Sequence, residues 1–158
     1  MCIRDRERAI RPGTEDIAGA VGLAKAVRLA VEEQAEKALR LEGIRDDLEE
    51  GLRGTIPGLR VNCAKAKRAC HVSSLGIPNV SDASGLLMAL DLEGIAVSGG
   101  SACHSGSGKG SHVIGALYGE DDPMATVRLS FGLGTSEADV ERALEVLPRV
   151  VTRMTAGA

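Results

Sequence analysis

The sequence predicts a small mixed α/β domain, with helices packed on one side of a small mixed or antiparallel sheet. Two observations predict this class. Apolar residues recur at helical spacing in the first third of the chain, and short β-branched runs then alternate with further helical patterns. The chain has 158 residues without an internal repeat or a long linker, which is enough for one domain with a substantial core.

Two helices are expected first. A turn at Pro12-Gly13 precedes Thr14, which could cap a helix that begins there. One face of this helix would carry Ile17, Val21, Ala24, Val27 and Val31. A second periodic stretch runs through Leu41, Ile44, Leu48 and Leu52, and ends at Gly54 and Pro57.

Short strands and helices follow in alternation. Strands are expected in GLRVNC (58–63), ACHVSSL (69–75), IAVS (95–98) and TVRLSFGL (126–133), and helices in DASGLLMALDLEG (82–94) and residues 111–118. The last helix begins with a capping box formed by Ser136 and Asp139. Its apolar face is expected to contain Val140, Ala143, Leu144, Leu147, Val151 and Met154.

The composition narrows the possible partners. The chain is 44% hydrophobic and 26% charged with a formal net charge of −3, and it has no basic run, so nucleic acid is not an expected partner. No apolar stretch is long enough for a membrane span. The four cysteines show no regular spacing and no secretory signal precedes them, which favours a cytoplasmic protein with free thiols. Residues 1–6, MCIRDR, do not continue into the pattern that follows and are expected to be a non-native leader.

The segment VSGGSACHSGSGKGSHV (97–113) places Cys103 among glycines and serines, directly after an expected strand. A structural cysteine packs in a hydrophobic core, and a disulfide-bonded cysteine needs a second cysteine. A thiol on a flexible, solvent-accessible segment can instead move between a substrate and an acceptor. Nucleophilic sulfur chemistry requires the thiolate, whose ordinary pKa is about 8.5. Cys103 is therefore a candidate nucleophile, although a loop cysteine without a function would show the same pattern.

Other polar residues allow further hypotheses. Metal ligation could draw on Cys63, Cys70, His71, Cys103, His104 and His112, but no standard ligand spacing connects them, so no metal site is expected. Instead, Cys63 and Cys70 are expected to pack at strand edges, with His71 half-buried. Arg128 points away from the apolar face of its strand, where it could be a solvated charge or could bind a carboxylate.

Three segments together resemble the C-terminal part of the cysteine desulfurases, a class V aminotransferase-like family of fold-type I pyridoxal-phosphate enzymes. They are RAIRPGTEDIAGAVGLAKA, LLMALDLEGIAVSGGSACHSG with its S-x-G-S-A-C motif, and TVRLSFGLGTSEADVERA. The resemblance extends from about Glu7 to the C-terminus. The long segment after Cys103 resembles the branch of the family that has a long active-site loop. It implies that residues 7–31 end the large cofactor domain and that residues 32–158 form the small C-terminal domain.

The resemblance also implies a mechanism. L-cysteine would react with pyridoxal 5′-phosphate, and the Cys103 thiolate would take the substrate sulfur as a persulfide, releasing L-alanine. Arg128 would hold the substrate carboxylate, and Thr14 would reach the cofactor phosphate across a homodimer interface. The sulfur would pass to an acceptor protein such as an iron–sulfur scaffold or a tRNA-thiolation enzyme.

The chain departs from the family pattern in three places. No lysine here lies in the family's Ser-x-His-Lys setting, so the chain alone is expected to be inactive. Lys109-Gly110 replaces a usual Glu-Pro, and Leu133 stands where arginine is common. Alternatives are a persulfide carrier that works without pyridoxal phosphate, a metal- or redox-sensing module, and a related lyase acting on selenocysteine or cysteine sulfinate.

Overall fold

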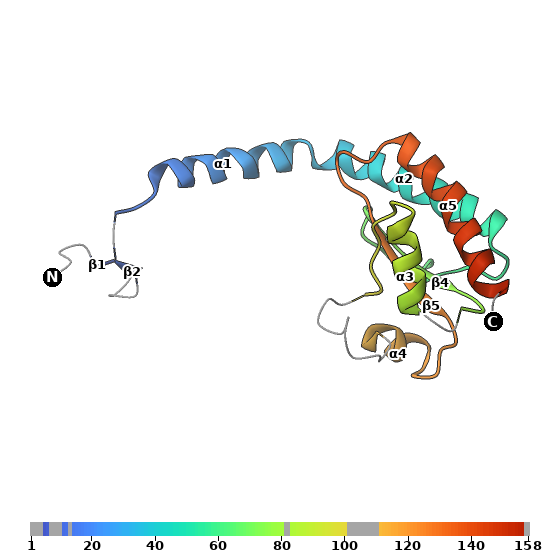
Figure 1. Ribbon diagram of the computed structural model, residues 1–158. Coiled ribbons are helices and arrows are strands. Elements are labelled where there is room, and N and C mark those ends of the chain that lie inside the picture. The colour runs from blue at the N-terminus through green and yellow to red at the C-terminus, as the bar shows by residue number, and fades with distance from the viewer. Residues whose placement is uncertain (1–4, 7–10, 13, 81–82, 101–110, 157–158) are drawn as a thin grey trace. The chain divides into compact units, whose positions relative to one another are not determined.

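The computed structural model describes residues 5–6, 11–12, 14–80, 83–100 and 111–156. The chain forms two compact units, residues 1–36 and residues 37–158 (Figure 1). The first unit contains the two-residue strands β1 (Asp5–Arg6) and β2 (Arg11–Pro12), which pair antiparallel, and the helix α1 (Ile17–Glu32).

The start of α1 differs from the sequence prediction. Asp16, and not Thr14, is the N-cap residue: its carboxylate accepts a hydrogen bond of 2.8 Å from the backbone N–H of Gly19. A short acidic side chain is a favoured cap because it satisfies an N–H of the first turn that has no partner inside the helix. Thr14 lies before the cap and is exposed.

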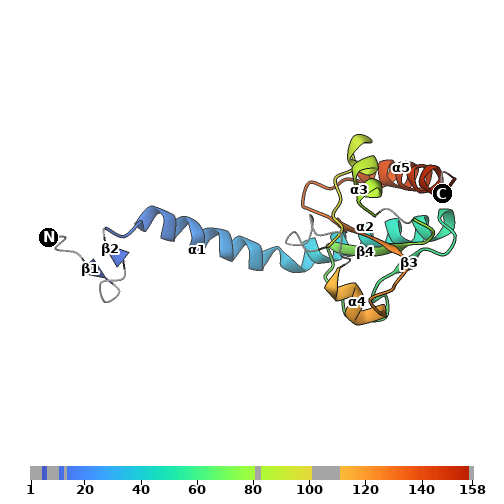
Figure 2. The same ribbon diagram turned by 60° about the horizontal axis from the view of Figure 1, so that its bottom comes forward.

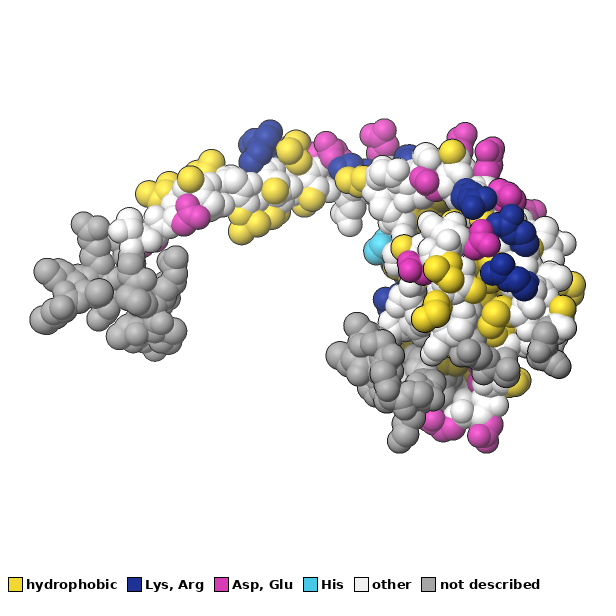
Figure 3. All heavy atoms as spheres, in the orientation of Figure 1, with side chains coloured by type: hydrophobic (Ala, Val, Ile, Leu, Met, Phe, Trp, Pro, Cys, Tyr) yellow, Lys and Arg dark blue, Asp and Glu magenta, His cyan; other side chains and the backbone are white. Residues whose placement is uncertain are grey.

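Helix α1 has the predicted periodicity, but all of its described residues are exposed within the first unit. Figure 3 shows hydrophobic side chains along this helix, and Ile17, Val21 and Val31 are each more than 60% exposed. A helix in water gains most of its stability from packing an apolar face. The apolar side chains of α1 therefore form a surface able to pack against another protein element.

The second unit is organised around a sheet of three antiparallel strands in the order β3-β4-β5. The strands are β3 (Arg60–Val61), β4 (Val72–Ile77) and β5 (Ala125–Ser130). Ser73, Leu75 and Ile77 are buried on one face of β4, and Val127 and Leu129 are buried on the same face of β5. The opposite face carries Ser74, Gly76 and Arg128, because side chains alternate along a strand.

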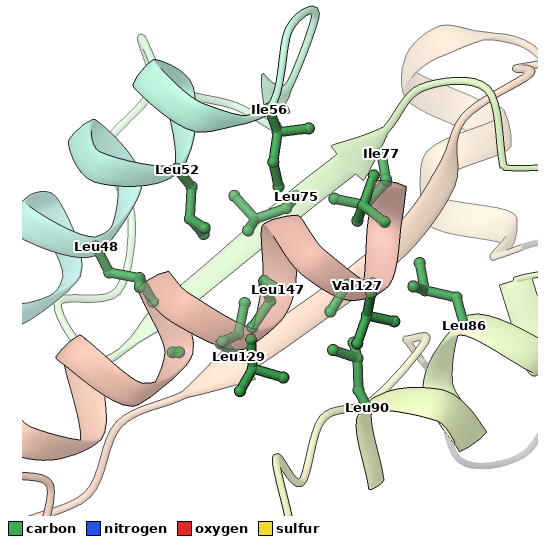
Figure 4. Packing of buried hydrophobic residues seen from close by; sticks show 14 of the residues in the cluster. Leu48, Leu52, Ile56, Leu75, Ile77, Leu86, Leu90, Val127, Leu129 and Leu147 are labelled. Carbon is green, nitrogen blue, oxygen red and sulfur yellow. The ribbon is translucent and has the colours of Figure 1, made fainter. Parts of the chain in front are cut away.

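Three helices supply the other half of the core. They are α2 (Gln34–Thr55), α3 (Ala83–Leu92) and α5 (Glu137–Ala156). In Figure 4, Leu48 and Leu52 of α2, Leu86 and Leu90 of α3 and Leu147 of α5 surround Leu75, Val127 and Leu129 of the sheet. Figure 2 shows α3 and α5 on one side of the sheet and the short helix α4 (His112–Tyr118) on the other. The predicted class, a small antiparallel sheet covered by helices, is confirmed.

The capping box of α5 is confirmed in detail. The backbone N–H of Ser136 donates to the Asp139 carboxylate at 2.8 Å, and the N–H of Asp139 donates back to Ser136 Oγ at 3.4 Å. The hydrogen bond from the Ser136 backbone is the main reason that the pKa of Asp139 lies below its ordinary value. The predicted apolar face is correct at Ala143, Leu147 and Val151, but it omitted Val146 and Val150, which are also buried.

Three local predictions are wrong. Residues Ile95–Ser98 do not form a strand; they contribute a single bridge between Ser98 and Arg128. His71 is exposed and not half-buried. Cys63 is exposed in a turn with φ of +56° instead of packing at a strand edge, because β3 ends at Val61. No helix in the described part of the chain is long and apolar enough to cross a membrane.

Candidate active site

Arg128 of β5 forms an antiparallel bridge with Ser98. Their backbones exchange two hydrogen bonds, 2.6 Å from Arg128 N–H to Ser98 O and 3.1 Å from Ser98 N–H to Arg128 O. The Arg128 guanidinium also donates to Ser98 Oγ at 3.4 Å. Arg128 is exposed, so its planar set of N–H donors can reach an anionic group such as a carboxylate.

Ser98 also fixes the backbone that follows it. Its hydroxyl donates to the carbonyl of Gly100 at 3.1 Å and accepts from the N–H of Gly100 at 3.3 Å. Gly100 has φ of +130°, a conformation that side-chain-bearing residues rarely adopt. The two residues form a tight turn at the point where residues 101–110 begin.

Gly100 and Ser111, the described residues on either side of residues 101–110, lie close together. A Cβ atom placed on Gly100 would lie 3.4 Å from both Cβ and Oγ of Ser111. Ser111 immediately precedes α4. The start of α4 is therefore a neighbour of the turn that Ser98 fixes.

The three residues predicted from the sequence have different outcomes. Arg128 lies at the site just described, on the face opposite to the core. Cys103 lies outside the described residues. Thr14 is exposed and belongs to the other compact unit. Of the three residues, the structure therefore places only Arg128 at the candidate site.

Two groups near Arg128 and on the neighbouring strands were not predicted from the sequence. Ser98 is the first serine of the quoted S-x-G-S-A-C motif, but its contact with Arg128 requires a bridge between distant segments. Arg60 and Tyr118 form a second polar cluster, in which the guanidinium lies 3.7 Å from the ring centroid. Alternating polar residues in LRVN, Arg60 and Asn62, were the available signal for that cluster.

The described residues contain no group of three His, Cys, Asp or Glu side chains arranged to hold a metal ion. Cys70 and His71 are neighbours with 3.9 Å between Sγ and Nδ1, but no third ligand type joins them in the described part of the chain. This arrangement gives no structural support for metal binding by the Cys70 region.

The fold and the site together define an α/β domain in which an exposed arginine of an antiparallel sheet, Arg128, pairs with Ser98, and in which Gly100 lies close to Ser111. Comparison with known families makes the assignment specific: the aminotransferase class-V family model matches residues 2–143. The chain belongs to the aminotransferase class-V family.

Relatives of this chain include proteins named as cysteine desulfurases. The chain is 42% identical over 154 residues to the IscS-like cysteine desulfurase of Mycobacterium tuberculosis, covering 94% of this chain and 38% of that protein. It is 37% identical to the cysteine desulfurase IscS of Clostridium botulinum, covering 92% of this chain and 37% of the relative. A solved NifS-like protein superposes with a TM-score of 0.73 at 28% identity, covering 95% of this chain and 38% of that one. The chain thus spans about two fifths of the length of the proteins it matches.

Proposed function

We propose that this chain is the C-terminal part of a pyridoxal-phosphate-dependent cysteine desulfurase. The activity is the transfer of sulfur from L-cysteine to Cys103, which yields L-alanine and a persulfide. The observation that carries the proposal is the pairing of Arg128 with Ser98, which stands five residues before Cys103 in the chain. The named relatives support the same reaction class.

Covalent geometry explains why this pairing suits such a reaction. Cys103 follows Gly100 by three residues, and an extended chain spans at most about 3.6 Å per residue. The Cα atom of Cys103 therefore stays within roughly 11 Å of that of Gly100. Because Ser98 ties Gly100 to the strand that carries Arg128, a substrate held by Arg128 lies within the range of the thiol.

Arg128 is proposed to hold the substrate carboxylate, with Ser98 fixing the direction of the guanidinium. The Cys103 thiolate then attacks the substrate sulfur. A sulfur–sulfur bond forms while the substrate carbon–sulfur bond breaks, and the carbon takes up a proton, so that L-cysteine and a thiol become L-alanine and a persulfide.

Bound pyridoxal phosphate would supply the electron sink for this cleavage. Within this chain, Thr14 is the residue proposed to contact it: its side chain is exposed, and a hydroxyl can donate a hydrogen bond to a phosphate oxygen. The residue that carries the cofactor covalently is proposed to be a lysine outside these 158 residues.

The domain assignment is part of the proposal. Residues 7–31 would end the large cofactor domain, and residues 32–158 would form the small domain. The exposed apolar side chains of α1 support this assignment, because they are suited to packing against a further domain. A homodimer that contributes Thr14 to the partner's site, and an acceptor protein such as an iron–sulfur scaffold, are proposed with it.

The test is to assay the full-length holoenzyme that contains this chain for L-alanine and persulfide formation from L-cysteine. We expect Cys103→Ser to abolish persulfide formation and Cys63→Ser, at an exposed cysteine outside the site, to retain it. Alanine formation that is unaffected by Cys103→Ser would contradict the proposal. Incubating the isolated 158-residue chain with L-cysteine and pyridoxal phosphate separately tests the expectation that the chain alone is inactive.

A further inference from the structure

Helix α4, which begins after residues 101–110, has little stabilisation of its own. It is 7 residues long, and none of its residues, all of which are described, is buried. Its N-cap residue, Ser111, makes no side-chain capping hydrogen bond within the described residues. Helices of this length are not stable alone in water, so the position of α4 must depend on contacts with its surroundings.

Arg60 of β3 provides the main polar contacts at the far end of α4. Its guanidinium lies over the ring of Tyr118, the last residue of α4, at 3.7 Å from the centroid. It also pairs with both carboxylate oxygens of Asp122, with Nη1 at 3.1 Å from Oδ1 and Nη2 bonded to Oδ2. The Tyr118 hydroxyl accepts a further hydrogen bond of 3.2 Å from the backbone N–H of Cys63.

A glycine in β4, Gly76, leaves the space that the Arg60 side chain occupies. Gly76 lies opposite Arg60 in the sheet, and a Cβ atom at Gly76 would be 3.2 Å from Nε and 3.3 Å from Nη2 of Arg60. The same Cβ would lie 2.9 Å from Sδ of Met124. Glycine in the middle of a strand is otherwise unfavourable, so its presence fits a close approach of a side chain.

The Arg60 contacts are continuous with the candidate active site. Arg60 Nε donates to Asn62 Oδ1 at 2.9 Å, and Asn62 Nδ2 donates to Ser74 Oγ at 3.0 Å. Ser74 is paired in register with Arg128. Polar groups therefore follow one another across this face of the sheet, from Arg60 through Asn62 and Ser74 to the proposed substrate-binding arginine.

We propose that Arg60 is a positioning residue for the desulfurase reaction: by binding Tyr118 and Asp122 it fixes α4, and with it Ser111, the first described residue after Cys103 in the chain. This inference rests on the proposed function for its catalytic consequence. Arg60 acts through α4 and touches neither substrate nor cofactor. A lysine at this position would keep the charge but lose the paired hydrogen bonds and the stacking on Tyr118.

The first experiment measures hydrogen exchange of the 158-residue chain carrying Arg60→Lys or Tyr118→Phe. We expect the amides of α4 to lose protection by about tenfold or more, while those of β4 and β5 keep theirs. The control is Arg53→Lys, the same change at an exposed arginine of α2. Unchanged α4 protection in both Arg60→Lys and Tyr118→Phe would overturn the positioning role.

The second experiment measures steady-state kinetics of the full-length holoenzyme. We expect Arg60→Lys to lower kcat by about tenfold with an unchanged KM for L-cysteine, because misplacement affects the reacting geometry more than the binding of the carboxylate. Tyr118→Phe should give a smaller change in the same direction. A purely structural role would lower the amount of folded enzyme and leave kcat per active site unchanged, which would overturn the proposal.

The two experiments separate the two hypotheses. In one outcome, Arg60→Lys loses α4 protection but the parent enzyme forms no persulfide on Cys103. That result would refute the proposed function and the catalytic role of Arg60, while the binding of α4 by Arg60 would stand. Normal persulfide formation with unaffected α4 protection and kcat in Arg60→Lys would refute the role of Arg60 alone.

Discussion

Ser98 and Arg128 exchange both of their backbone hydrogen bonds although 30 residues separate them in the sequence. This pairing is the only residue-to-residue bridge outside the named strands in the described part of the chain. It connects the turn at Gly100 to the sheet and places an exposed guanidinium beside that turn. Gly100 and the proposed carboxylate-binding group are therefore connected through Ser98.

Changing Arg128 to lysine should weaken the binding of L-cysteine to the full-length holoenzyme. Lysine keeps the charge but cannot make two parallel hydrogen bonds to a carboxylate, so we expect KM to rise by about ten- to a hundredfold. Steady-state kinetics with varied L-cysteine would measure it. Arg153→Lys, at an exposed arginine of α5, is the control and should leave KM unchanged. An unchanged KM in Arg128→Lys would remove the carboxylate-binding role.

Glu49 should be among the most sensitive polar positions of the second unit. Its side chain is 4% exposed, and it accepts hydrogen bonds from Arg68 at 2.7 and 3.0 Å and from Ser73 at 2.7 Å. Glu49→Ala would leave the arginine and the buried hydroxyl without their acceptor, at a cost of about 3 kcal/mol of unfolding free energy. Urea denaturation would measure the loss. The adjacent exposed Glu50→Ala should change stability by about 0.5 kcal/mol or less, and equal losses at both positions would contradict this interpretation.

The close approach between α2 and α5 depends on Gly51. A Cβ atom there would lie 2.5 Å from Cδ2 of Leu144, so Gly51→Ala should force the two helices apart or shift the leucine. We expect a destabilisation of about 1 to 3 kcal/mol. A Cβ atom on Gly43, in the same helix, would have no described neighbour within 4 Å, and Gly43→Ala should be stabilising by about 0.5 to 1 kcal/mol. Thermal and urea unfolding of the two variants would compare them, and a stabilised Gly51→Ala variant would be inconsistent with the packing.

The ion pair between Arg60 and Asp122 should make the free energy of unfolding depend on pH. The hydrogen bond from Arg60 is the main reason that the pKa of Asp122 lies below its ordinary value of 3.8. The stabilisation is therefore fully present above the unfolded-state pKa and is lost as pH falls through the lower folded-state pKa.

Asp122→Asn should consequently be less stable than the parent chain at neutral pH, and the difference should shrink as pH falls below about 4. Urea midpoints measured from about pH 7 to about pH 2.5 would test this. Asp121→Asn, at the exposed neighbour, should show a small difference that does not vary in this way. A gap between Asp122→Asn and the parent chain that stays constant with pH would show that the charge of Asp122 is not responsible.

The sequence by itself determined the features that depend on residues close together in the chain. The spacing of Leu41, Leu48 and Leu52 predicted α2, and the alternation of Val127 and Leu129 predicted the buried face of β5. Ser136 and Asp139 predicted the start of α5, because the donors and acceptors of a capping box lie within one helical turn. Three segments together, one of them around Cys103, predicted the family for the same reason, since the residues of each segment are contiguous in the chain.

The tertiary structure decided which of these segments meet. Arg60 and Asp122 are 62 residues apart in sequence, and their contact depends on the register of β3 with β4 and on the space above Gly76. Ser98 looked like part of a strand, but only its pairing with Arg128 showed that the chain touches the sheet at one residue there. Periodicity records which face of an element is apolar, whereas the polar contacts across a sheet depend on strand register, which no short stretch of sequence contains.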